Sequence, residues 1–282
     1  MQADQSHKTG TISVETVQEN FIAYHRHFAD LPNVTFVEDA DTAWITSHGA
    51  PGSSVLRTNF APDSAAAQID ETLRRVGQHV DAVDWMVWPD DQPDNLGEEL
   101  AERGAAGGPG GKWMLYGNQG NQPGTWLVID LESLAERVPV SADFRVEQVQ
   151  NEAQFDVWVD INARGFGSSD YSAFRAAYLL HGFGDDAQAI HFVGFLGDQP
   201  VTSSTLLIAG GSASAYNIST PVGLRGQGFG SAITHATLLV ARERGFASSW
   251  IWSSPMGRSV YQKLGFVITD FGIREYQWKK RE

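Results

Sequence analysis

The chain has 282 residues, no cysteine and a formal net charge of −14. This length is sufficient for one or two domains with a sizeable core. The lack of cysteine excludes disulfides, a thiolate zinc site and a cysteine nucleophile. The acidic charge disfavours a nucleic-acid partner, because phosphate backbones are bound by basic surfaces.

The first residues, Met1 to Lys8, lack the basic region and apolar core of a secretory signal. No apolar run reaches the roughly 18 residues of a membrane span. We therefore expect a cytoplasmic protein with no membrane partner. Residues 1–140 carry 21 acidic and 8 basic residues, whereas residues 141–282 carry 13 and 12. This asymmetry favours a cationic small molecule or basic peptide as partner, although acidity also keeps a protein soluble.

The first half of the chain alternates helical and extended patterns. Ala66, Ile69, Leu73 and Val76 recur at helical spacing. The pattern predicts helices over 14–29, 64–79 and 96–103, and strands over 34–37, 43–47, 54–59 and 83–89. The glycine-rich segments 104–111 and 117–124 are expected to be loops. A strand over 126–130 would complete a first sheet, with 131–141 as the linker.

The second half continues with strands and helices in a fixed order. A strand over 144–149 precedes helices over 151–164 and 170–180, the second with Ser169 or Asp170 as N-cap. A hairpin over 189–209 turns at Gly197 and Asp198. The remaining predicted elements are a strand to Thr220, a helix over 231–244, a strand over 248–252, a helix over 258–263, and strands over 266–270 and 273–278 that would complete a second sheet.

The most informative segment is the glycine-rich turn Arg225-Gly226-Gln227-Gly228-Phe229-Gly230, between a predicted strand and a predicted helix. Such a turn offers free amides and the positive end of a helix dipole, which together form an anion site. A dinucleotide fingerprint would need a different glycine spacing and an acidic residue about 20 positions on. A phosphate-binding Walker loop would need a lysine, and none lies between Lys112 and Lys263.

The remaining pattern, R-x-x-G-x-G before a helix, resembles the coenzyme A loop of the GNAT acyltransferase superfamily. A second motif follows over 258–266, where a short helix carrying Tyr261 is closed by Gly265 and Phe266. The resemblance covers about residues 144–276. It implies an α/β (α+β) fold with a mixed central sheet flanked by helices, and acetyl-CoA (coenzyme A) as cofactor.

The resemblance also assigns roles to residues. Tyr261 would be the general acid that protonates the departing thiolate. Ser254 stands where the family often has an asparagine that contacts the cofactor, and Gly257 replaces a common alanine. The residues expected to bind the cofactor are Ile218, Ser219, Thr220, Arg225, Gly226, Gln227, Gly228, Phe229, Gly230, Ser231 and Ser254.

The general base stays open. The strand that ends at Thr220 carries no acid, so the candidates are Glu147, Asp170, Tyr171 or no residue at all. The eight histidines form no metal signature, and we expect no metal site. The tryptophans lie in apolar strands, where packing is the expected role.

The two halves resemble each other. The strand at Trp85–Trp88 followed by a helix and glycine parallels the strand at Trp250–Trp252 followed by the Tyr261 helix. We therefore expect two tandem GNAT-like domains, a degenerate one over 1–135 and a catalytic one over 142–282. The alternative is that residues 1–130 form an unrelated α/β domain.

The sequence thus predicts an N-acetyltransferase that acetylates a primary amine of a small molecule or peptide. Transfer would be direct in a ternary complex, because no cysteine can carry the acyl group. The acceptor would lie between the domains or against residues 166–170. The alternatives are a non-catalytic acyl-CoA-binding sensor and a scaffold built on a decayed enzyme. The acceptor, the acyl chain length and a homodimeric state stay open.

Overall fold

A computed structural model describes residues 12–109, 124–168 and 170–280. Residues 117–123 of the loop predicted over 117–124, residues 110–111 of the loop predicted over 104–111, and the candidate cap Ser169 lie outside these residues. The first half contains α1 (Val14–Arg26), β1 (Val34–Glu38), β2 (Thr42–Ser47), β3 (Ser54–Thr58), α2 (Ala65–Val76), β4 (Ala82–Val87), α3 (Leu96–Glu102), β5 (Ala106–Pro109) and β6 (Thr125–Asp130).

After a short 3-10 turn, η1 (Leu131–Ser133), the second half begins. It contains β7 (Phe144–Gln148), α4 (Glu152–Phe166), α5 (Ser172–His181), β8 (Ala189–Leu196), β9 (Gln199–Ala209), β10 (Ser212–Ser219), η2 (Val222–Leu224), α6 (Phe229–Glu243), β11 (Ser248–Ser253), α7 (Pro255–Lys263), β12 (Val267–Ile268) and β13 (Arg274–Lys279). Ala106–Pro109 is therefore a strand and not the loop that its glycines predicted, because its backbone pairs with β13.

Capping residues set the ends of the helices that border the site. Asn151 accepts a hydrogen bond from the Gln154 amide at the start of α4, and Gly167 closes this helix in a left-handed conformation. Ser254 accepts a hydrogen bond from the Gly257 amide at the start of α7. No described helix has the length and apolar character needed to cross a membrane.

The strands form two mixed sheets with the same core topology. One sheet has the order β1-β2-β3-β4-β13-β5 and the other β12-β6-β11-β10-β9-β8-β7. In both, two neighbouring parallel strands pair at just two positions: β3 with β4, and β10 with β11. An antiparallel strand then follows beside β4 and beside β11. The internal repeat expected from the sequence is therefore present in the topology.

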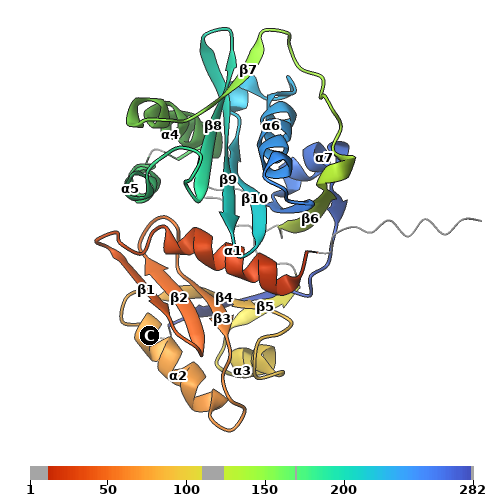
Figure 1. The fold of residues 1–282 in the computed structure, drawn as a ribbon. Coiled ribbons are helices and arrows are strands. Elements are labelled where there is room, and N and C mark those ends of the chain that lie inside the picture. The colour runs from red at the N-terminus through yellow and green to blue at the C-terminus, as the bar shows by residue number, and fades with distance from the viewer. Residues whose placement is uncertain (1–11, 110–123, 169, 281–282) are drawn as a thin grey trace, which may run out of the picture.

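The two sheets exchange one strand each, which corrects the predicted assignment of these strands. β6, expected to complete the first sheet, pairs with β11 of the second. β13, expected to complete the second sheet, lies between β4 and β5 of the first. In Figure 1 the blue C-terminal strand runs among the strands of the first sheet. Neither sheet is therefore confined to one side of the expected boundary at 135–142.

Helix α1 lies between the two sheets (Figure 1). Its Asn20 is fully buried, and its Nδ2 donates to the carbonyls of Leu207, Ala209 and Ser212. The Tyr216 hydroxyl donates to Asn20 Oδ1 over 3.0 Å. One apolar cluster of the described residues contains parts of α1 and of both sheets, including Trp88, Trp126 and Trp250. The expected packing role of these tryptophans is confirmed.

We predict that the fragments 1–135 and 142–282 do not fold when produced separately. Each would lack a strand from the interior of its sheet, so that β5 or β12 loses the neighbour it pairs with. Denaturant titration followed by circular dichroism should show no cooperative transition for either fragment. Mixing the two should restore one, as for the intact chain. Cooperative unfolding of 142–282 alone would contradict this interpretation.

Candidate functional site

The site is built around a gap between two parallel strands. β10 and β11 pair only at Ala213–Ser249 and Ser214–Trp250, although β10 continues to Ser219. Beyond Ser214 no described position of β10 pairs with β11, so the strands diverge. β10 also bulges between Tyr216 and Ser219. The resemblance places the pantetheine arm of the cofactor against Ile218, Ser219 and Thr220, on this same segment.

The glycine-rich turn closes one end of the gap. Gly226 and Gly228 have φ values of +79° and +87°, a region that favours glycine. Within the described residues, the amides of 226–231 donate to no backbone carbonyl and no side chain. They lie at the start of the long helix α6, whose dipole is positive at this end. This run of free amides is a cradle for an anion such as a diphosphate.

The two left-handed glycines differ in their surroundings. A Cβ atom at Gly226 would have nothing within 4 Å, so this residue faces open space. A Cβ atom at Gly228 would lie 2.8 Å from the Pro139 carbonyl oxygen. Glycine is therefore required at position 228 because the linker backbone at Pro139 packs against it. At position 226 the absence of a side chain leaves the cradle open. The ring of Phe229 stacks on Phe144 with centroids 5.6 Å apart and anchors the start of α6.

Arg225 fixes the turn through its side chain. Its guanidinium donates to the carbonyls of Thr220 and Gly165, over 2.9 and 2.8 Å. Its own amide donates to the Val222 carbonyl, so the run of free amides begins at Gly226 and not at Arg225. Arg225 thus joins the end of β10 to the end of α4. Gln227 is exposed and Ser231 half-buried at the cradle.

Two exposed apolar side chains border the same turn. Val222 is 71% and Met256 50% exposed, and they are among the few large apolar residues on the described surface. The Arg225 guanidinium lies 3.3 Å from the Met256 sulfur. The backbone amide of Arg225 donates to the Val222 carbonyl. These two side chains offer apolar surface next to the cradle. They would contact the apolar part of a ligand whose phosphates lie on the turn.

Tyr261 lies on α7, which follows directly from β11. Its side chain is buried, and burial raises its pKa well above the ordinary value, so the hydroxyl stays protonated at neutral pH. A Cβ atom at Gly257 would lie 2.8 Å from the Tyr261 ring. This contact explains the glycine at a position where the family has alanine. Ser254 caps α7, and its contact with a cofactor stays a prediction.

The three candidate bases have other contacts. Glu147 bonds Arg145 over 2.8 Å on the edge strand β7. Asp170 accepts a hydrogen bond from the Ser172 amide, and its bonds to Ser172 hold its pKa below the usual range. Its carboxylate thus bonds the first amide of α5, but the N-cap position is occupied by Tyr171 and not by Asp170 as predicted. Tyr171 stacks on Phe174 with centroids 4.4 Å apart. The identity of a base stays open.

Sequence reasoning missed the residues at the bulge of β10. Asn217 has φ +51°, and its Nδ2 donates to the Tyr178 hydroxyl over 3.3 Å. Tyr216 stacks on Tyr24 with centroids 4.8 Å apart. The bulge is thus held by α5 on one side and by α1 on the other. The only sequence signal was an asparagine late in a strand, since asparagine tolerates the left-handed region.

The equivalent gap in the first sheet is closed. β3 and β4 diverge beyond Val55–Trp85. There the Trp88 indole donates to the Leu56 carbonyl over 2.7 Å. Asp91 accepts from the Thr58 amide, and the Gln92 amide donates to the Thr58 carbonyl. Segment 88–92 therefore occupies the edge of β3 that corresponds to the open edge of β10.

The fold is similar to that of solved acetyltransferases. A GCN5-related N-acetyltransferase from Kribbella flavida aligns with a TM-score of 0.65 and 13% identity, over 96% of this chain and 97% of its own. A tandem GNAT protein from the clavulanic acid biosynthesis pathway aligns with a TM-score of 0.60 and 14% identity, over 100% of this chain and 98% of its own.

A GCN5-related N-acetyltransferase from Sphaerobacter thermophilus aligns with a TM-score of 0.56 and 11% identity, over 82% of this chain and 73% of its own. No family model matches the chain, and no curated protein matches it significantly. At these identities the likeness establishes the fold alone, so the expected fold with two tandem GNAT-like units is confirmed.

We predict that Asp91 makes stability depend on pH. Burial raises its pKa to about 7, against hydrogen bonds from Trp88, Thr58 and Gln18. Folding therefore favours the protonated carboxyl. Its contribution to the free energy of unfolding is fully present below the ordinary pKa of 3.8 and is lost as the pH rises through 7. Relative to Asp91→Asn, the wild-type chain should lose on the order of 4 kcal/mol of unfolding free energy between about pH 4 and pH 8.

Urea titrations of both proteins across this range measure the difference. Asp90→Asn, at the exposed neighbouring position, should follow the wild-type curve. A constant difference between wild type and Asp91→Asn at all pH values would contradict a raised pKa.

Proposed function

We propose that the chain is an N-acetyltransferase that moves an acetyl group from acetyl-CoA to a primary amine of a small molecule or peptide. The observation that carries the proposal is the run of free amides at 226–231 beside the open β10–β11 gap. Acetyl-CoA would supply the activated thioester. Its diphosphate suits the cradle, and its pantetheine arm suits the unpaired edge of β10.

Acyl transfer requires that the thioester is held, its carbonyl polarised and the departing thiolate protonated. The amides of the turn and the backbone of Ile218, Ser219 and Thr220 would hold the donor. Tyr261 would donate the proton, because its raised pKa keeps the hydroxyl protonated. Transfer would be direct in a ternary complex, since the chain has no cysteine to carry an acyl group.

The acceptor is proposed to approach the gap from the side of α1 and α5. Tyr216 and Asn217 lie on the bulge and contact α1 and α5, respectively. An acceptor there would lie between the two halves of the chain. The acidic first half favours an amine that is cationic in solution.

A second candidate is a sensor that binds acyl-CoA without turnover. It is favoured by one observation, that Glu147 and Asp170 are engaged elsewhere. The two candidates share the cradle and differ in the role of Tyr261.

We predict that acetyl-CoA binds at one site per chain and that Gly226→Trp weakens binding by at least about tenfold. A side chain at Gly226 would enter the open cradle, while segment 88–92 already closes the first-sheet gap. Isothermal titration measures both the stoichiometry and the affinity. Gly245→Trp is the matched control, because Gly245 has φ +88° and open space but lies at the other end of α6.

Two sites per chain would contradict a closed first-sheet gap. If acetyl-CoA does not bind at all, both the acetyltransferase and the sensor are excluded. If Gly226→Trp binds acetyl-CoA as tightly as the wild-type chain, the binding site does not lie at the turn.

We predict that Tyr261→Phe lowers kcat by about a hundredfold while leaving the dissociation constant of acetyl-CoA within about twofold, because general acids typically contribute such factors. Release of free coenzyme A with a panel of primary amines measures the rate. Tyr276→Phe, on β13 of the other sheet, should leave it unchanged. If Tyr261→Phe retains full turnover, the general-acid role is wrong. If no amine supports turnover by the wild-type chain while acetyl-CoA binds, the sensor is favoured.

A further inference from the structure

The C-terminal ends of α1 and α5 meet at a pair of histidines. His27 is the C-cap of α1 and is only 2% exposed. His181, the last residue of α5, is exposed. The centroids of the two imidazole rings lie 4.5 Å apart, and His181 Nε2 donates to the His27 carbonyl over 3.2 Å. This contact joins the first half of the chain to the second.

The hydrogen bonds of His27 leave one ring nitrogen without a partner. Nδ1 lies 2.8 Å from the Ala23 carbonyl oxygen, which can only accept, so Nδ1 carries the hydrogen. In the neutral ring Nε2 therefore holds a lone pair, and this atom is buried with no partner among the described residues. A proton added to Nε2 would create a buried charge and a buried N–H with no acceptor, and both are costly.

The groups that face His27 do not compensate a positive charge. They are Arg26 on α1, Tyr178 and His181 on α5, and His191 on β8. Arg26 is a cation, and a protonated His181 would be another. Within the described part of the chain, no Asp or Glu forms an ion pair with His27. Burial, together with His181 and Arg26, lowers the pKa of His27, against the hydrogen bond to Ala23.

α5 is the element that covers His27. The rings that contact His27 are Tyr178 and His181, both on α5. The other two buried histidines near this contact differ. His191 also packs against Phe155 and Trp158 of α4, and the His25 ring contacts its own helix. Movement of α5 would therefore bring His27 to water and leave His191 and His25 covered.

α5 also holds the candidate site. The Tyr178 hydroxyl accepts from Asn217, the left-handed residue of the β10 bulge. Among the described residues, the other side-chain bonds from α5 to neighbouring elements are the His181 contact and the exposed pairs of Arg175 with α4. An element held by few bonds can open locally while the rest of the fold persists.

We propose that the contact of α1 with α5 is an acid-sensitive switch, in which proton uptake by His27 releases α5 and frees the bulge of β10. The released state binds more protons than the closed state, so a fall in pH favours release. The stabilisation is fully present above the ordinary histidine pKa of about 6.5 and is lost as the pH falls below it. This inference rests on the fold and not on acetyl transfer.

The test is hydrogen–deuterium exchange of the full-length chain at about pH 7.5 and about pH 5.5, the range in which histidine titrates. Rates are corrected for the intrinsic pH dependence of exchange. Peptides that cover α5 and residues 215–219 should lose about tenfold in protection at the lower pH, because a released imidazole is then about ten times more often charged than neutral. α2, which contains no histidine, should change by less than about twofold.

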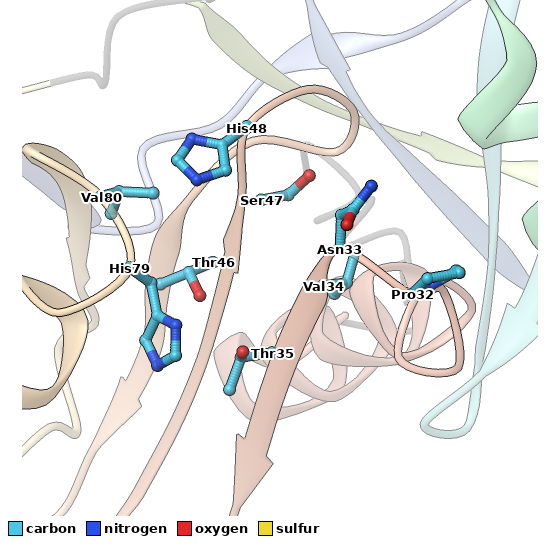
Figure 2. Close-up of a pocket in the computed structure, with 9 residues that line it drawn as sticks. All are labelled: Pro32, Asn33, Val34, Thr35, Thr46, Ser47, His48, His79 and Val80. Atoms are coloured by element: carbon cyan, nitrogen blue, oxygen red, sulfur yellow. The ribbon is translucent and has the colours of Figure 1, made fainter.

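Two variants remove the titrating group. His27→Phe keeps a buried ring that takes no proton, and His27→Asn keeps a donor for the Ala23 carbonyl. In both, the protection of α5 should change by less than about twofold between the two pH values. His48→Asn is the matched control. Figure 2 shows His48 beside a hollow of the first sheet, where it is exposed, and this variant should respond as wild type.

The proposal is overturned if α5 of the wild-type chain keeps its protection at the lower pH. It is also overturned if α2 loses as much protection as α5, since acid would then act on the whole fold. A His27→Phe or His27→Asn chain that is folded by circular dichroism and responds as wild type would overturn it as well. None of these readouts requires acetyl-CoA, so they are independent of the proposed function.

Discussion

The exchange of β6 and β13 between the two sheets is the constraint on which the rest of the structure depends. β6 pairs along its length with β11, and β13 pairs along its length with β4. β11 and β4 are each one wall of a gap between parallel strands. Each gap is therefore supported from behind by a strand that comes from the other half of the chain. Through β6 the first half of the chain therefore supports the candidate site of the second half.

Two diverging strands leave backbone groups without partners, and the two sheets resolve this differently. In the first sheet the chain closes the gap itself, with Trp88, Asp91 and Gln92 bonded to the edge of β3. In the second sheet the edge of β10 stays open to a ligand. Buried backbone groups without a hydrogen-bond partner are costly. The unpaired segment of β10 therefore needs other contacts to hold its position. Asn20 of α1 bonds the turn between β9 and β10, and the Tyr216 hydroxyl bonds Asn20.

Much of the second sheet could be predicted from the sequence, because its signals are local. The glycines of the turn, the Ser254 cap and the Gly265 that ends the Tyr261 helix each fix the backbone within a few residues. The positions of β6 and β13 could not be predicted in this way. Residues 125–130 are predicted to form a strand, but no local signal assigns this strand to one sheet and not the other. The choice is made by long-range packing of Trp126 against Trp250, which no local pattern encodes.

The closed gap of the first sheet was also hidden from the sequence, for a related reason. Residues 57–62, the counterpart of the glycine-rich turn in the first half, contain no glycine. The sequence therefore predicts no phosphate cradle there, but it does not show what fills that place. The filling segment contains Asp91, whose carboxyl oxygens accept hydrogen bonds from three separate elements. This arrangement arises only once α1, β3 and the loop after β4 have come together.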